Sequence, residues 1–294
     1  LRQPRRSRRV KTKKKRHPCA ILAQKFVAEL VGTFFLIVTI GLAAGQDEAL
    51  APIAIAASVW CAKYCFGHVS GAHINPSVTF GAYIRGTMPI ADSLVYVAGQ
   101  FAGAFIGAVV SDVDLHSAVD CVKNSTDGIN TCGSGFPNVN PEYSNNLGVP
   151  LSMEAVFTFM LVAVGLNCQA TKKVEGNGYY GFAIGSVILV GVVAVGDISG
   201  GAFNPAVGTS LPVIAGDTQY VWIYWCGPLL GAFFAGLLFY VTSDPEEYTA
   251  RPHQGCVFFG DIRCCCSKEP EPEPEPDQRL EMATLSVRGI RDAE

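Results

Sequence analysis

The amino-acid sequence predicts an all-α membrane protein with six transmembrane helices and two shorter re-entrant helices. The first observation is the composition, because 49% of the 294 residues are hydrophobic and only 16% are charged. The second is a series of long uncharged runs, several of which reach the roughly 20 residues needed to cross a bilayer as a helix. The third is a pair of similar Asn-Pro stretches, each too short to cross.

Charge and proline content divide the chain into three predicted parts. Residues 1–20 form a basic arm, since ten of the 22 Lys and Arg residues fall within the first 16 positions. Such an arm beside membrane spans indicates a cytoplasmic tail, and we expect no nucleic-acid partner. Residues 21–243 form the membrane domain. Residues 244–294 contain a Glu-Pro repeat that is too charged and too rich in proline to build a core, so this tail is predicted to be disordered.

Six apolar segments in the membrane domain are predicted to span the lipid bilayer, at about residues 21–44, 49–66, 90–110, 150–168, 179–195 and 219–241. Glu29 in the first span and Glu154 in the fourth are costly in lipid unless they have partners, so both are candidate site residues. Lys63 lies near the end of the second span, where its long stem is expected to reach the membrane interface. One face of the third span predicts a close helix contact through its glycines Gly99, Gly103 and Gly107.

Basic residues predict the orientation of the chain. They concentrate in the arm, around Lys63 and Arg85, at Lys172 and Lys173 and after the last span, whereas the connections after spans one, three and five contain only Lys123. Six spans with both termini cytoplasmic satisfy this bias. The polar loop after the third span then faces the other side, where glycosylation of Asn124 and a disulfide between Cys121 and Cys132 are candidate modifications.

The chain also contains an internal repeat with an offset of roughly 125 to 130 residues. Repeat one covers about residues 21–112 and repeat two about residues 150–243. The halves match at Glu29 and Glu154, at Asn75-Pro76 and Asn204-Pro205, and at the segments that begin with Tyr96 and Tyr224. Each half has three spans, an odd number, so the second half must insert upside down. Inverted repeats place their working site near the bilayer midplane.

The two short helices therefore enter the membrane from opposite sides, and their starts can meet in its centre. Proline suits the first helical position, and the preceding Asn can cap the helix while it keeps an amide donor free. Two helix amino-termini that face one point oppose the passage of protons and cations. The residues before each Asn expose carbonyl oxygens, which is tolerated at this depth only along a watery cavity. These features predict a pore for small neutral polar molecules.

The chain resembles the major intrinsic proteins, the aquaporins and aquaglyceroporins, over about residues 25–243. The resemblance rests on the boxes Asn75-Pro76-Ser77 and Asn204-Pro205-Ala206, on the duplicated glutamates and on the run Ser-Gly-Ala-His at residues 70–73. Gly-Ala-Tyr after the first box and Asn-Pro-Ala-Val at the other box are most similar to the tonoplast intrinsic proteins. The family implies an aquaporin-like fold that assembles as a homotetramer with one pore in each subunit.

The resemblance also implies roles for individual residues. Asn75 and Asn204 would donate hydrogen bonds to the passing molecule. Glu29 and Glu154 would tie down the re-entrant loops, with help from His73. A ladder of acceptor carbonyls would be formed by Gly71, Ala72, His73, Ile74, Gly200, Gly201, Ala202 and Phe203.

Two departures from the family pattern matter for the substrate. Ser77 replaces alanine in the first box, and its hydroxyl is expected to bond its own helix with little effect. The family's narrow filter commonly has an arginine three residues after the second Asn, where this chain has Val207. The other filter positions are Ile55, Val192 and Gly201. This apolar filter without a fixed cation predicts a wide pore that conducts water together with glycerol, urea and ammonia.

The sequence favours a passive channel over three alternatives. An inverted-repeat secondary transporter would need charged groups exposed at its binding site. An enzyme is not expected, because no nucleophile with a base, phosphate-binding loop or metal-ligand cluster is apparent, and we expect no cofactor and no metal. A pore-less adhesion or receptor protein on the same fold is at odds with the intact Asn pair. The expected partners are the lipid bilayer, water and small neutral solutes, and the membrane is either vacuolar or plasma membrane.

Overall fold

A computed structural model of the chain describes residues 18–43, 49–118 and 137–243. The whole predicted tail, residues 244–294, lies outside the described residues. The same is true of residues 1–17 of the predicted basic arm and of Asn124, Cys121 and Cys132.

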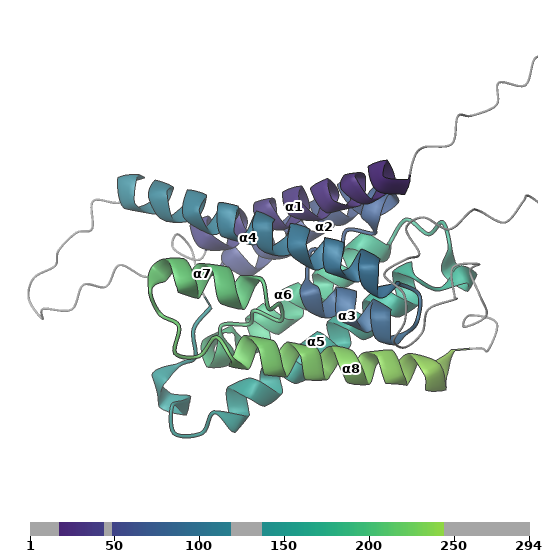
Figure 1. The fold of residues 1–294 in the computed structure, drawn as a ribbon. Coiled ribbons are helices and arrows are strands. Elements are labelled where there is room, and N and C mark those ends of the chain that lie inside the picture. Colours follow the sequence, from purple (N-terminus) through teal and green to yellow (C-terminus); the bar gives the residue numbers. More distant parts are fainter. Residues whose placement is uncertain (1–17, 44–48, 119–136, 244–294) are drawn as a thin grey trace, which may run out of the picture. The chain divides into compact units, whose positions relative to one another are not determined.

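The described residues form helices and no strands, in two halves with the same order of elements. The first half contains α1 (Pro18–Ala43), α2 (Ala51–Ser70), the short α3 (Pro76–Ile84) and α4 (Ile90–Ala118). The second contains α5 (Gly148–Gln169), α6 (Tyr180–Ser199), the short α7 (Val207–Ala215) and α8 (Ile223–Thr242) (Figure 1). Two single-turn 3-10 helices, η1 (Pro141–Tyr143) and η2 (Lys172–Val174), flank α5. The predicted alternation of long and short helices is confirmed.

Five of the described helices, α1, α4, α5, α6 and α8, are long and apolar enough to cross a membrane. Helix α2 has the same length as α6, 20 residues, but it carries the polar side chains of Lys63 and His68. Several large apolar side chains on the long helices are exposed on the outside, where lipid or a neighbouring subunit can cover them: Phe35, Ile106, Val156, Phe182 and Phe234. The prediction of an all-α, multi-pass membrane protein is confirmed.

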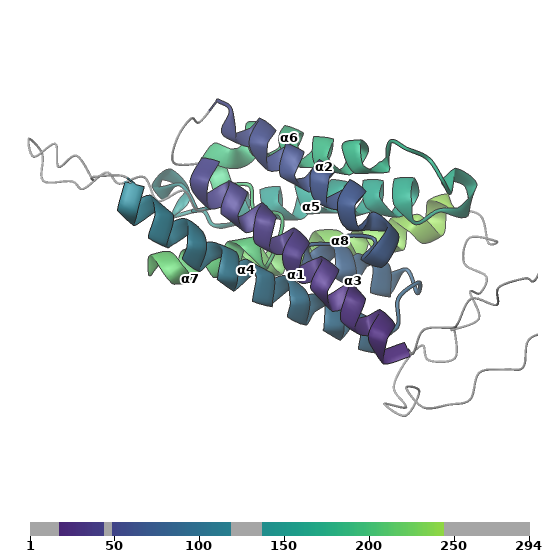
Figure 2. The same cartoon turned by 90° about the horizontal axis from the view of Figure 1, so that it is seen from above.

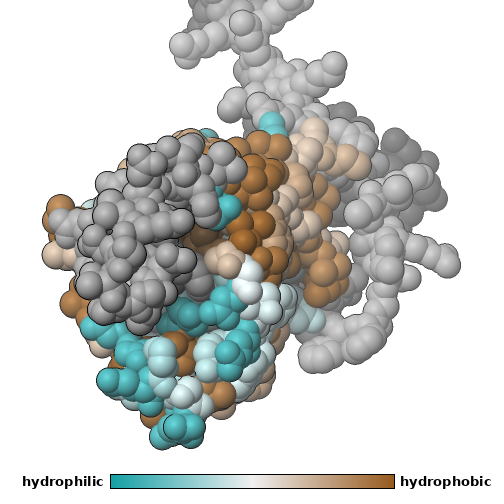
Figure 3. Space-filling view, turned by 90° about the vertical axis from the view of Figure 1, so that its left-hand side faces the viewer, coloured by the Kyte–Doolittle hydropathy of each residue, from teal (hydrophilic) through white to brown (hydrophobic). Residues whose placement is uncertain are grey.

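One end of the helices is capped by the segment of residues 137–147, at the lower left of Figure 1. Its exposed side chains include Asn138, Glu142, Asn145 and Asn146. Figure 3 shows this end with a hydrophilic area in its lower part beside the apolar surface of the helices. The separation of polar end from apolar side is what a membrane-spanning chain requires.

Helix α1 packs along α4, and α5 packs along α8 (Figures 1 and 2). Glycine makes both contacts close. A Cβ atom added at Gly103 would overlap the backbone of Leu30 in α1, and one added at Gly231 would overlap the backbone of Ala155 in α5. The remaining glycines that face a neighbouring backbone in these two contacts are Gly99, Gly107 and Gly227. The predicted glycine contact of the third span is therefore confirmed, and the second half repeats it.

Helices α2 and α6 both continue about four residues beyond their predicted ends and stop at a glycine. Gly71 has a φ of 83° and Gly200 a φ of 82°, a left-handed conformation that glycine adopts without steric cost. The Gly71 N–H bonds the Gly67 carbonyl at 3.0 Å, and the Gly200 N–H bonds the Gly196 carbonyl at 2.8 Å. The apolar pattern ends earlier than the helix because the last turn contains polar residues, the exposed His68 and Asp197 and the buried Ser70 and Ser199.

We expect the substitution Gly103→Val to destabilise the protein, because the new side chain would meet the α1 backbone, which has no rotamer to change. Overpacking of this kind costs about 1–3 kcal/mol. The measurement is the thermal unfolding midpoint of the purified protein in detergent. Gly165→Ala is the matched control, since nothing lies within 4 Å of a Cβ atom at that position. Equal midpoints for the two variants would contradict the close contact of α1 and α4.

Candidate pore

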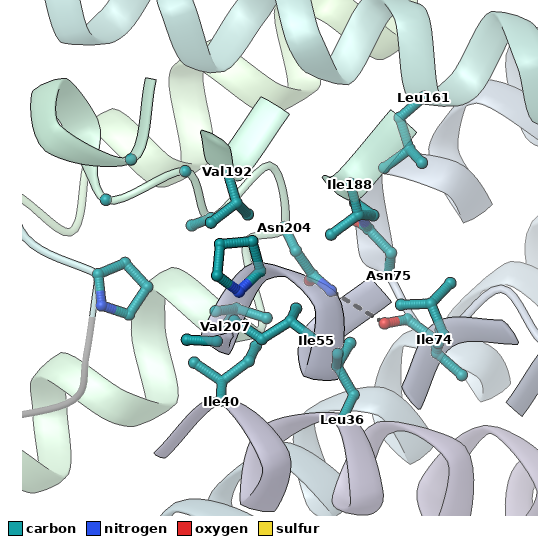
Figure 4. Close-up of a pocket in the computed structure, with 18 of the residues that line it drawn as sticks. Leu36, Ile40, Ile55, Ile74, Asn75, Leu161, Ile188, Val192, Asn204 and Val207 are labelled. Atoms are coloured by element: carbon teal, nitrogen blue, oxygen red, sulfur yellow. Dashed lines mark hydrogen bonds between the residues drawn. The ribbon is translucent and has the colours of Figure 1, made fainter. Parts of the chain in front are cut away.

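The two Asn-Pro boxes meet at the amino-terminal ends of the short helices α3 and α7. The Nδ2 atom of Asn75 donates to the Phe203 carbonyl at 2.9 Å, and the Nδ2 atom of Asn204 donates to the Ile74 carbonyl at 2.9 Å (Figure 4). Each box thus bonds the loop that precedes the other box. These reciprocal bonds place the two asparagines beside each other although they are far apart in the chain.

The oxygen of each asparagine side chain also accepts a backbone hydrogen bond near the start of the short helix that follows, and Asn75 is the N-cap of α3. The Oδ1 atom of Asn75 accepts from the Ser77 N–H at 2.8 Å, and that of Asn204 accepts from the Ala206 N–H at 3.0 Å. Pro76 and Pro205, directly after the asparagines, need no acceptor because proline has no N–H. A side-chain amide has two N–H donors, so each asparagine keeps one donor beyond the bond to the opposite loop.

Glu29 lies wholly buried in α1 and binds the loop before α3. Its carboxylate accepts from the backbone N–H groups of His73, at 2.9 Å, and Ile74, at 2.6 Å. It also accepts from the Ser70 hydroxyl at 2.6 Å and from the Gln100 amide at 2.8 Å. Four hydrogen-bond donors offset much of the free-energy cost of burying a carboxylate within the membrane.

Glu154 repeats this arrangement in the second half of the chain. It is wholly buried in α5 and accepts from the backbone N–H groups of Ala202, at 3.0 Å, and Phe203, at 2.7 Å. The Ser199 hydroxyl donates to it at 2.8 Å. The structure therefore brings each buried glutamate to the loop of its own half, where non-helical backbone needs acceptors.

Two tyrosines complete the loops and were not singled out from the sequence. The Tyr96 hydroxyl donates to the Ser70 carbonyl at 2.7 Å, and the Tyr224 hydroxyl donates to the Ser199 carbonyl at 2.7 Å. Both carbonyls belong to the last residue of a long helix, where no further helical N–H is available. The signal for them was present, because Tyr96 and Tyr224 begin the segments that match between the repeats.

The loops hold three residues in a conformation that side chains other than glycine rarely adopt. Ala72, Ile74 and Phe203 have φ values of 46°, 47° and 48°. Such left-handed residues cost on the order of 1–3 kcal/mol each and persist where surrounding contacts hold them. Here the N–H groups of Ile74 and Phe203 are both held by a glutamate.

The asparagines of the two boxes and the predicted filter positions line one cavity of about 720 Å³, whereas the other box residues, Pro76, Ser77, Pro205 and Ala206, are not among its described lining residues. Asn75 and Asn204 lie on its wall, and so do all four predicted filter residues, Ile55, Val192, Gly201 and Val207. In Figure 4 the side chains of Ile55, Val192 and Val207 gather on one side of Asn204, and Ile74 and Asn75 lie on the other.

Helices α2 and α6 supply most of the remaining wall, each with one face. Residues at four-residue spacing line the cavity, Ile55, Val59 and Lys63 on α2 and Ile184, Ile188, Val192 and Gly196 on α6. Four-residue spacing keeps side chains on one side of a helix. The wall is therefore apolar except at the boxes, at His73, and at Lys63 and Asp197 among the described lining residues.

Comparison with known proteins identifies the family. A family model described as Major intrinsic protein matches residues 16–239. The chain belongs to the major intrinsic protein family. It is 32% identical to aquaporin-4 of Bos taurus over 68% of this chain and 58% of that protein, and 33% identical to a probable aquaporin, NIP7-1, of Arabidopsis thaliana over 73% and 74%.

Two further similarities concern proteins named for glycerol. The chain is 29% identical to a glycerol uptake facilitator protein-like 6 of Lactiplantibacillus plantarum over 72% of this chain and 94% of that protein. The crystal structure of an aquaglyceroporin from Plasmodium falciparum shares the fold, with a TM-score of 0.63 at 21% identity over 74% of this chain and 95% of that one. The matches to aquaporin-4 span about three fifths of that protein's length. Membership of the tonoplast branch stays a prediction.

Within this family fold, the position of Lys63 differs from the sequence prediction. The side chain is 1% exposed, and its Nζ atom donates to the Gln169 Oε1 atom at 2.9 Å and to the Gly71 carbonyl at 3.2 Å. The prediction that Lys63 reaches the membrane interface is wrong. The stem instead runs along the cavity face of α2, because acceptors from α5 and from the loop lie within reach there.

The predicted carbonyl ladder divides into two groups. His73, Ile74, Gly200, Gly201 and Ala202 line the cavity. The other three ladder residues are not among its described lining residues, and two of their carbonyls are bonded within the protein. The Gly71 carbonyl accepts from both Lys63 and Gln169, and the Phe203 carbonyl accepts from Asn75. A carbonyl has two lone pairs, so Gly71 has no acceptor capacity left for a solute.

Two residues of the first box region have contacts that the sequence did not predict. The Ser77 hydroxyl is wholly buried and finds no hydrogen-bond partner within the described part of the chain, so the expectation that it bonds its own helix is wrong. The Nδ1 atom of His73 lies 3.1 Å from the Thr79 hydroxyl, so its ring is fixed to α3.

We expect Glu154→Ala to unfold the second loop, because the N–H groups of Ala202 and Phe203 lose their acceptor. Each buried donor without a partner costs about 1–3 kcal/mol. The thermal unfolding midpoint in detergent should fall strongly, and water permeability in liposomes should fall with it. Glu142→Ala, which removes an exposed carboxylate in η1, is the matched control. A midpoint equal to that of the control would show that the loop does not depend on Glu154.

Proposed function

We propose that this protein is a passive channel that conducts water and small neutral solutes, namely glycerol, urea and ammonia, through the cavity of each subunit. One observation carries the proposal. A single cavity is lined by both box asparagines and all four filter positions, and its side chains are apolar between a few polar groups. Such a wall gives a permeating molecule few sites at which it can bind and stay, which is the condition for rapid conduction.

The polar groups of the cavity can replace the hydration of a neutral molecule. Asn75 and Asn204 each keep one N–H donor, and the loops supply carbonyl acceptors in the opposite direction. The amino-termini of α3 and α7 meet at the same place, and their helix dipoles oppose a cation there. We propose that the channel therefore favours molecules that are polar but uncharged.

The filter supports solutes larger than water. Ile55, Val192 and Val207 present only hydrocarbon, and Gly201 presents no side chain at all. Gly201 has a φ of 62°, and a Cβ atom there would lie 3.3 Å from the Val192 Cα atom, so the two positions face each other closely. We propose that the ring, which has no arginine, excludes solutes by size alone, and that it is wide because Gly201 adds no side chain to it. The similarity to a glycerol uptake facilitator protein-like protein agrees with this range.

We propose further properties that follow from the family. Glu29 and Glu154 act as tethers of the re-entrant loops and take no part in binding solute. The protein assembles as a homotetramer, in which the outward apolar side chains of the long helices supply the contacts. Both termini are cytoplasmic, in a vacuolar-type or plasma membrane. The activity requires no cofactor, and the protein is not an enzyme.

We expect proteoliposomes with the native chain to swell in isosmotic gradients of glycerol and of urea. The substitution Val207→Arg should lower both solute permeabilities by about tenfold, or about 1.4 kcal/mol of barrier, because the guanidinium narrows the ring. Water permeability should change less. Stopped-flow light scattering measures all three rates.

Val207→Leu is the matched control, since it adds volume without a charge or a donor. Its solute permeability should lie between those of the native chain and the arginine variant. Swelling of the native vesicles in water gradients alone would contradict the wide filter. An arginine variant that conducts glycerol as fast as the native chain would show that Val207 is not in the ring.

A secondary transporter is the second candidate, and one observation favours it. The cavity has a charged group toward each end, Lys63 on α2 and Asp197 on α6, and transporters couple solutes through such groups. The channel remains the better-supported function because the buried acids Glu29 and Glu154 are fully engaged by loop donors.

The concentration dependence of flux separates the two candidates. A channel with weak sites should give urea flux that rises linearly with the gradient and does not depend on a proton or sodium gradient. The measurement is uptake of labelled urea into proteoliposomes over a wide concentration range. Saturation together with acceleration by an imposed ion gradient would favour the transporter and contradict the channel.

A further inference from the structure

The four filter positions have counterparts in the other half of the inverted repeat. The offset of 129 residues that relates Asn75 to Asn204 applies equally to the ends of α2 and α6 and to the loops that follow. It relates the filter residues Val192, Gly201, Val207 and Ile55 to a second set, which we call the image ring: Lys63, Ala72, Val78 and Ile184.

The image ring belongs to the same cavity as the filter. Lys63, Val78 and Ile184 line its wall. Ala72 is buried and has a left-handed φ of 46°, which matches the φ of 62° at its counterpart Gly201. Ile55 and Lys63 lie eight residues apart on one face of α2, or about 12 Å along the helix axis at about 1.5 Å per residue. The filter and the image ring are therefore two successive passages in one pore.

Lys63 is the residue that distinguishes the two rings. Among the described residues that line the cavity it is the one with a cationic side chain of the lysine or arginine type. It has two acceptors, Gln169 and the Gly71 carbonyl, for three N–H donors. In the described part of the chain no carboxylate lies within ion-pair distance of it, whereas Lys25 pairs with Asp92 at 2.8 Å. Its positive charge is thus not neutralised by a direct partner.

A purely structural role does not explain Lys63. The Gln169 Nε2 atom already donates to the Gly71 carbonyl at 2.6 Å, so this carbonyl has a partner without the lysine. Lys63 is not needed as a hydrogen-bond partner of Glu29 either, because both carboxylate oxygens are already engaged by loop and side-chain donors. A buried charge is costly, and such charges in transmembrane helices commonly face a water-filled cavity and serve transport.

We propose that Lys63 makes the image ring a charge filter, which excludes small cations that the wide apolar filter admits by size. The inference rests on the proposed channel function and deepens it. A fixed positive charge in a narrow passage with low-dielectric walls repels a cation much more strongly than it would in water. It leaves an uncharged solute of the same shape unaffected. The pore then selects by size at Val207, and the charge of Lys63 adds to the barrier that the helix dipoles at the boxes present to a cation.

Urea and guanidinium provide the test, because they are planar molecules of similar size that differ by one positive charge. Uptake of each labelled compound into proteoliposomes is measured at low concentration, with valinomycin and potassium as a counter-ion path for guanidinium. The native chain should conduct urea and exclude guanidinium. Lys63→Met should raise guanidinium uptake by at least about tenfold, while urea uptake stays near the native rate.

Three further variants separate the effect of the Lys63 charge from the effect of its hydrogen bonds and packing. Lys63→Arg keeps the charge and should exclude guanidinium as the native chain does. Lys63→Gln keeps an N–H donor without the charge, and it serves as a second neutral variant where the methionine variant fails to fold. Lys25→Met removes a lysine that pairs with Asp92 and does not line the cavity, so it should leave the exclusion intact. Water permeability of each variant shows that the pore is assembled.

The outcomes are distinct. Guanidinium uptake by Lys63→Met and Lys63→Gln, with exclusion by the arginine variant, would support the charge filter. Guanidinium uptake by the native chain, or exclusion by both neutral variants while they conduct urea, would overturn it and leave the channel function standing. Absence of both water and urea flux in the native chain would refute the channel function, and the charge filter with it.

Discussion

The fold depends on two buried carboxylates that hold irregular backbone in the middle of a membrane. At this depth every backbone N–H needs a protein partner, and the loops before α3 and α7 have no helix to provide one. Glu29 and Glu154 supply the acceptors from neighbouring helices. The close glycine contacts keep those helices in place, since Gly103 brings α4 against α1 and Gly231 brings α8 against α5. The loop residues that line the pore are therefore positioned by the two glutamates and by the close helix contacts.

Because the chain is an inverted repeat, each contact that holds a re-entrant loop occurs once in each half. The glutamate, the serine that donates to it, the tyrosine on the last helical carbonyl and the capping asparagine all occur twice. A ring of pore-lining positions must then also occur twice, once on each side of the boxes. Where a filter residue and its counterpart in the image ring are alike, the two rings have the same chemistry. Where they differ, the two rings can select for different properties of the solute. The pair Lys63 and Val192 is such a difference.

Much of this arrangement was predictable from the sequence, for physical reasons. Apolar runs and four-residue glycine spacing are local signals, and a lone glutamate in a span demands a partner wherever it lies. The burial of Lys63 at the cavity was not predictable, because a lysine near the end of a span is expected to extend its side chain to the membrane interface. Its Gln169 acceptor lies 106 residues away in the chain. The environment of the Ser77 hydroxyl was not predictable either, since it is set by packing of α3 against other helices.

Two passages in series have consequences that a single filter does not have. A solute must cross both, so the higher of its two barriers limits its flux. A wide apolar ring at Val207 would by itself admit a neutral molecule and its protonated form nearly alike, since they hardly differ in size. The charge at Lys63 raises the barrier only for the protonated form. With the charge barrier placed at Lys63, the filter is free to widen toward larger neutral solutes without opening a path for their cations.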